Sequence, residues 1–110
     1  MITLVIHAPD HRVKRTGAKS FEAVLADGIG KGYILSQREV SKLLPGSKVV
    51  LLRKDGLERR AEGWLVVRPV PTMKTPRGKQ RYDVHINDLR EVSYQPEKLN
   101  RYGVAVIDDC

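Results

Sequence analysis

The sequence contains a single cysteine, and it is the last residue, Cys110. One thiol allows neither a disulfide within the chain nor a zinc site built from several thiolates. A lack of disulfides is typical of a reducing compartment, so we predict a cytoplasmic protein. The first apolar run, residues 2–6, is soon followed by Pro9 and Asp10, which makes it too short for a signal sequence or a membrane span. We therefore expect no membrane partner.

Aromatic residues are also scarce, at 5% of the chain. The core must therefore be built from Val, Ile and Leu, which suit strands. The chain has 110 residues, of which 41% are hydrophobic, and no linker or internal repeat divides it. This length supports one modest core, so we predict a single domain over residues 1–110.

Short apolar or alternating segments predict strands. They occupy residues 3–7, 33–35, 48–53, 59–67, 82–86, 89–94 and 104–107. Ser36 and Glu39 match a capping box ahead of an apolar face, which predicts a short helix over residues 37–44. Residues 21–25 fit either a helix capped by Ser20 or a further strand. Together these segments indicate a mainly β (α+β) fold, a small β-barrel with one or two short helices.

Glycine, asparagine and aspartate mark the expected turns. Residues 27–32 read Asp-Gly-Ile-Gly-Lys-Gly and predict a glycine-rich loop. This loop is either a backbone nest that holds a phosphate beside Lys31, or a turn where crowding demands glycine. Asp55-Gly56 predicts a hairpin turn, and Asn87-Asp88 predicts another turn. Gly63 interrupts a strand and indicates a bulge or a close backbone approach.

Basic residues outnumber acidic ones by 20 to 13, which gives a net charge of +7. Such a balance favours a partner rich in phosphate, although it can also serve solubility alone. Residues 68–81 contain five basic residues, three prolines and no acid, and they predict a long cationic loop without regular structure. We therefore predict nucleic acid, RNA or DNA, as the partner. The expected phosphate contacts are Lys31, Arg59, Arg60, Lys74, Arg77, Lys79 and Arg81.

Three aromatic side chains are candidates for stacking on bases: Tyr33, Trp64 and Tyr82. A lone tryptophan in a small β-barrel is also a natural core residue, so Trp64 has two readings. Tyr82 borders the cationic segment, and we expect its ring to be exposed.

Catalysis and metal binding find little support in the sequence. His7, His11 and His85 lack the spacing of metal ligands, and no nucleophile motif is present, so we predict no metal, no cofactor and no catalytic residue. Two other functions stay open. The protein could be an adaptor that contacts an acidic protein partner, or a small hydrolase that acts on a nucleotide or nucleic acid.

The middle of the chain resembles a known superfamily. Tyr33-Ile34-Leu35, a short helix, Leu44-Pro45-Gly46-Ser47-Lys48 leading into a strand, a charged hairpin and then Glu62-Gly63-Trp64-Leu65 are similar to PUA-like domains over about residues 30–67. In this motif Ser47 replaces the usual aspartate. The resemblance implies a pseudo-β-barrel that binds RNA or modified bases in DNA. It also implies an aromatic pocket for a flipped base, with Tyr33 and Trp64 as the nearest equivalents.

Overall fold

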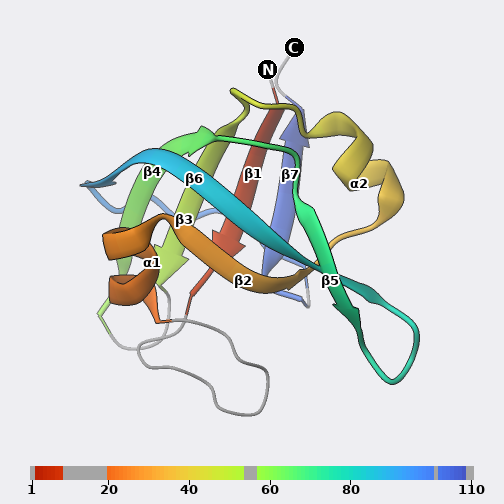
Figure 1. Cartoon of the computed structure of the whole chain (residues 1–110). Helices are drawn as coiled ribbons and strands as arrows, with labels where there is room; N and C mark the ends of the chain where they lie inside the picture. Colours follow the sequence, from red (N-terminus) through yellow and green to blue (C-terminus); the bar gives the residue numbers. More distant parts are fainter. Residues whose placement is uncertain (1, 9–19, 54–56, 101, 109–110) are drawn as a thin grey trace.

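The structure is a computed structural model that describes residues 2–8, 20–53, 57–100 and 102–108. Seven strands form one curled sheet in the order β2-β6-β4-β3-β1-β7, and β5 pairs with β6 as well (Figure 1). The strands are β1 (Ile2–His7), β2 (Ile29–Ile34), β3 (Lys48–Arg53), β4 (Arg59–Leu65), β5 (Val70–Lys74), β6 (Gln80–Val92) and β7 (Val104–Asp108). The predicted mainly β fold with one or two short helices is confirmed, and the described residues contain two helices.

Two helices lie in the crossover between β1 and β3, which pair in parallel. The helix α1 (Phe21–Asp27) begins at Ser20, whose side chain accepts a hydrogen bond from the Ala23 amide, so the helical reading of this segment is the right one. The helix α2 (Gln37–Lys42) has the predicted capping box between Ser36 and Glu39, and it ends two residues earlier than predicted. Neither helix is long and apolar enough to cross a membrane, as far as the described residues go.

The sheet is covered on both faces at its centre. On one face, Leu4 of β1 and Leu51 of β3 join Phe21 of α1 in the main core. On the other face, Val5, Val50 and Leu52 are covered by Tyr94 and Leu99, which belong to the segment between β6 and β7. We call this second face the outer face. Because both faces are covered here, β1 and β3 are continuous apolar runs, as the sequence predicts.

The strand β6 runs without interruption through Asn87 and Asp88, so the predicted turn at these residues is wrong. Asn87 pairs with Trp64 and Arg90 pairs with Glu62, which leaves two residues of β6 opposite Gly63. This is a β-bulge, and Asp88 adopts a left-handed backbone (φ 52°) that suits an aspartate. The close approach predicted at Gly63 is confirmed, because a Cβ atom there would lie 2.8 Å from the Asn87 carbonyl oxygen.

The cationic segment is a β-hairpin, so the prediction of a loop without regular structure is wrong. Residues 70–74 form β5, which pairs with the first half of β6. Pro71 fits because β5 lies at an edge of the sheet, where a missing amide donor is tolerated. Thr75 accepts a hydrogen bond from the Gly78 amide (2.9 Å) and donates its own amide to Lys79 (2.8 Å). Gly78 takes a positive φ of 82°, which closes the turn.

The predicted glycine-rich loop is also wrong, because β2 begins at Ile29 and includes most of it. The crowding explanation accounts for Gly28, where a Cβ atom would lie 2.5 Å from the Ile86 carbonyl oxygen, and for Gly30, where it would lie 2.7 Å from the Tyr33 ring. The predicted Asp55-Gly56 turn, His11 and Cys110 lie outside the described residues.

Candidate nucleic-acid interface

The β5–β6 hairpin presents three of the predicted phosphate contacts, Lys74, Arg77 and Lys79. All three are exposed. None of them forms an ion pair with another described residue, and the hairpin carries no acid between β4 and Asp83. Figure 1 shows this hairpin projecting away from the rest of the sheet. Its cations are therefore available to an external anion.

Two pockets lie along this hairpin. One, of about 470 Å³, lies between it and the start of α2; Lys74 and Lys79 line it together with Leu35, Gln37 and Tyr82. The other, of about 400 Å³, is lined by Arg77 and Lys79 with Ile34, Pro76 and Tyr102. The hairpin thus brings its basic side chains to both pockets, which combine positive charge with apolar surface.

Arg81 and Tyr82 of β6 were predicted to contact nucleic acid, but both side chains contact the protein itself. Arg81 is half-buried and donates a hydrogen bond from Nη1 to the Gly32 carbonyl oxygen at 2.7 Å, so it fastens β2 to β6. Tyr82 is only 7% exposed and belongs to the core, so the expectation of an exposed ring is wrong. The alternation of β6 explains this, because Tyr82, Val84 and Ile86 all point to the core side of the sheet.

Arg59 is neutralised by acidic residues. It makes a two-pronged ion pair with Glu91 (2.8 and 2.6 Å), contacts Glu22, and lies 4.6 Å above the centre of the Phe21 ring. The hydrogen bonds to Glu91 and Glu22 raise the pKa of Arg59 and lower that of Glu91. We therefore no longer count Arg59 as a phosphate contact.

Arg60 is also committed to the protein itself. Its side chain, on the outer face, donates to Glu62 (2.9 Å), to Glu97 (3.2 Å) and to the Gln95 carbonyl oxygen (2.9 Å). It is only 6% exposed. Arg60 thus ties the segment between β6 and β7 onto the sheet, and it too is withdrawn from the predicted phosphate contacts.

The two predicted side chains on β2, Lys31 and Tyr33, differ in their exposure. Lys31 is exposed and has no ion pair with another described residue, so it remains a predicted phosphate contact. Tyr33 packs against the main core and against Gly30. Burial raises the pKa of its hydroxyl. The ring is therefore largely a packing element, and stacking on a base has little free face to use.

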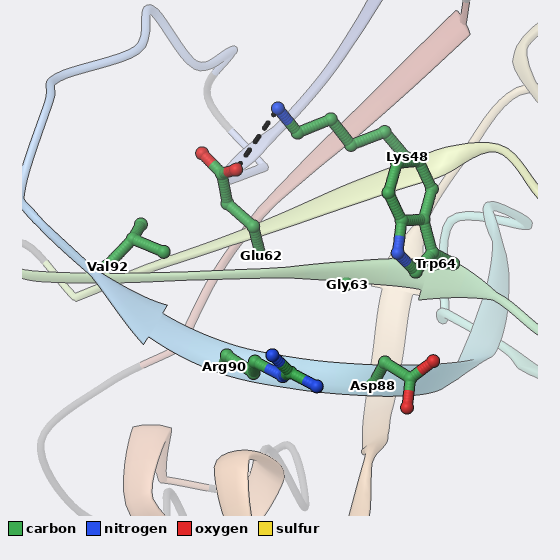
Figure 2. A pocket seen from close by; sticks show the side chains of 7 residues that line it. All are labelled: Lys48, Glu62, Gly63, Trp64, Asp88, Arg90 and Val92. Carbon is green, nitrogen blue, oxygen red and sulfur yellow. Dashed lines mark ion pairs between the residues drawn. The ribbon is translucent and has the colours of Figure 1, made fainter.

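Trp64 is not a core residue, because 44% of its surface is exposed. Figure 2 shows Trp64 on β4 beside Lys48, with the charged residues Asp88 and Arg90 on the neighbouring strand β6. A pocket of about 400 Å³ forms here. We call it the Trp64 pocket, and its lining consists of Lys48, Glu62, Gly63, Trp64, Asp88, Arg90 and Val92. Part of the outer face is therefore left open as a site with an aromatic wall.

Some charged side chains of the Trp64 pocket are paired within the protein, and others are not. Glu62 is paired: one of its carboxylate oxygens lies 3.1 Å from the Lys48 ammonium, and the other lies 2.9 Å from the Arg60 guanidinium. Burial tends to raise its pKa, but the bonds from Lys48 and Arg60 outweigh burial and lower it. Asp88 and Arg90, by contrast, make no ion pair or side-chain hydrogen bond with another described residue.

Sequence reasoning missed Lys48, Asp88 and Arg90 as companions of Trp64. They meet only through strand pairing: Lys48 pairs with Trp64 across β3 and β4, and the bulge aligns β6 with β4. The sequence does not show the register shift at Gly63, so it could not show that Asp88 and Arg90 lie beside Trp64.

Searches of protein-family models, curated proteins and solved structures find no match to this chain. The similarity to PUA-like domains therefore stays a prediction. No cluster of three or more potential metal ligands occurs within the described part of the chain.

Proposed function

We propose that this protein binds nucleic acid through the phosphate backbone, with the β5–β6 hairpin as its main contact. The observation that carries the proposal is the contrast between two sets of cations. Arg59 and Arg60 are matched to carboxylates within the protein, whereas Lys74, Arg77 and Lys79 are exposed and unpaired among the described residues. Cations that release counterions from phosphates supply most of the affinity of such complexes.

The shape of the hairpin supports this proposal. A two-stranded ribbon fits a groove of duplex nucleic acid, and its side chains can equally follow a single strand. Lys31 on β2 and Arg68 ahead of β5 are also exposed and add positive charge outside the hairpin turn. A cytoplasmic location and membership of the PUA-like superfamily are further parts of the proposal, which the single cysteine and the Pro-Gly entry to β3 favour.

The test is the salt dependence of binding. Fluorescent single- and double-stranded RNA and DNA are titrated at several salt concentrations with the wild type and with the triple variant Lys74→Ala, Arg77→Ala, Lys79→Ala. Each phosphate contact contributes roughly 0.9 to the slope of log K against log salt for duplex DNA and roughly 0.7 for single strands. Loss of three contacts is therefore expected to reduce the slope by about 2–3.

A matched control removes the same charge elsewhere. The variant Arg38→Ala, Lys42→Ala, Lys98→Ala changes three exposed cations on α2 and on the segment after β6. We expect it to change the slope much less than the hairpin variant. Equal losses in both variants would mean that net charge alone attracts the nucleic acid, and absence of binding at low salt would refute the proposal.

An exposed apolar strip favours a second function, an adaptor that binds an acidic protein. Val66, Val67, Val70 and Met73 are between 40% and 69% exposed, and they follow one another along the chain into the hairpin. A mixed apolar and basic surface is typical of protein interfaces. Capture of a partner that survives nuclease treatment and is lost in Met73→Ser would favour this function.

A further inference from the structure

The Trp64 pocket offers a planar ligand a specific set of contacts. The exposed indole supplies a face for stacking. The carboxylate of Asp88 accepts hydrogen bonds only, and the guanidinium of Arg90 donates only. Both groups come from β6, two residues apart, and neither is used within the described protein. A ligand that matches the pocket must therefore present donors to Asp88 and an acceptor to Arg90 beside an aromatic ring.

The other carboxylate of the pocket, Glu62, already has partners within the protein. Lys48 and Arg60 each pair with one of its oxygens, so Glu62 does not require a cation from the ligand. Asp88 is the carboxylate that still lacks donors, and its exposure makes it accessible. The carboxylate of Asp88 and the guanidinium of Arg90 are therefore the charged groups of the pocket that have no ion-pair partner among the described residues.

We propose that the Trp64 pocket binds an unpaired guanine base of single-stranded nucleic acid. The base stacks on Trp64, its N1–H and N2 amino groups donate to the Asp88 carboxylate, and Arg90 donates to O6. This inference deepens the proposed function and rests on it. It adds base selectivity to a hairpin that recognises phosphates alone.

The other bases do not fit this arrangement. Only guanine has two neighbouring donors on its Watson–Crick edge, which a carboxylate can receive together. Adenine and cytosine place a ring nitrogen acceptor beside their single amino donor, and uracil flanks its one N–H with two carbonyl oxygens. In each of these bases an acceptor would face the Asp88 oxygens, and two acceptors placed against each other form no hydrogen bond.

The experiment uses oligouridylates that carry one central guanine, inosine or adenine. Trp64 is the only tryptophan in the chain, so its fluorescence reports the occupation of this pocket directly. We expect the guanine oligonucleotide to bind on the order of tenfold more tightly than the adenine one, which is within the usual discrimination of a two-pronged base contact. Inosine lacks the N2 amino group, so it should fall between them.

Two variants separate base reading from general charge. Asp88→Asn keeps a residue that tolerates positive φ, so the bulge is preserved, but an amide cannot accept both guanine donors. It should abolish the preference for guanine. The matched control Asp108→Asn removes the same charge from the end of β7, which lies four positions from β6 in the strand order. This variant should retain the preference for guanine. Equal binding of guanine and adenine by the wild type, or a preference that survives in Asp88→Asn, would overturn the inference.

A further titration distinguishes failure of the hairpin proposal from failure of the guanine site. Free GMP and AMP are titrated against the wild type and the triple hairpin variant, with Trp64 fluorescence as the signal. Selective quenching by GMP in both proteins supports the pocket even if no oligonucleotide binds. Salt-dependent binding of every oligonucleotide, without any difference between GMP and AMP, retains the hairpin function and rejects the guanine site.

Discussion

Replacing Arg60 by Met is expected to destabilise the protein without weakening its binding of nucleic acid. Arg60 makes three hydrogen bonds, two of them ion pairs, and it joins β4 to the segment that covers the outer face. Met preserves the apolar stem but leaves Glu97 and the Gln95 carbonyl oxygen without their partner. The change therefore separates a structural arginine from a phosphate contact.

The magnitude follows from the burial of the partners. Removing one member of a buried ion pair costs about 3–5 kcal/mol. Here Glu62 and Glu97 are each 29% exposed, so water replaces part of the lost interaction, and Glu62 keeps Lys48. We expect a loss of about 2–3 kcal/mol in the free energy of unfolding. For a chain of this size, that loss corresponds to a fall in Tm on the order of 10 °C.

Urea denaturation followed by circular dichroism measures the stability, and oligonucleotide titration of the folded variant measures the binding. Arg38→Met is the control, because Arg38 is exposed on α2 and Arg and Met have similar helix propensities. It should change the stability by less than about 0.5 kcal/mol. An equally small change in Arg60→Met, or a loss of affinity comparable to that of the triple hairpin variant, would refute the structural assignment.

Two further outcomes test the bulge and the ion pair between Arg59 of β4 and Glu91 of β6. Gly63→Ala should cost about 1–3 kcal/mol by urea denaturation, since its Cβ atom would lie 2.8 Å from the Asn87 carbonyl oxygen; unchanged stability would mean that the backbone yields easily. The bond from Arg59 lowers the pKa of Glu91, so the stability that Glu91 contributes is present above the usual carboxyl range and is lost as pH falls through its folded pKa. Glu91→Gln should therefore lose less stability than the wild type when urea midpoints are compared between about pH 6 and pH 3, and identical pH profiles would contradict the ion pair.

Local sequence signals predicted the elements in which the local preference of the residues agrees with the structure around them. The apolar runs of β1 and β3 and the capping box of α2 were sufficient, because burial on both faces and a capped helix leave direct traces in the residues. The failures arose where strand pairing overrides local preference. Pro71 is accommodated by an edge strand, and Asn87-Asp88 is accommodated by a bulge opposite Gly63.

The candidate site was predictable only in part, for the same reason. Composition located the basic hairpin, but charge alone could not show that Arg59 and Arg60 face carboxylates from α1, β6 and the segment after it. Alternation correctly gives Tyr82 an inward direction once the sheet is known, and the exposure of Trp64 depends on how far the segment after β6 extends over the outer face.

The strand β6 connects the hairpin to the Trp64 pocket, and its length limits the distance between these two sites. Lys79, just before this strand, and Arg90, near its end, are eleven positions apart, so at a rise of about 3.3 Å per residue they lie at most about 36 Å from one another. An oligonucleotide shorter than the actual separation of these two residues can occupy either the hairpin or the Trp64 pocket, but not both. Once its length bridges them, the second contact becomes intramolecular, and the affinity should rise steeply at that length instead of growing evenly with each added nucleotide.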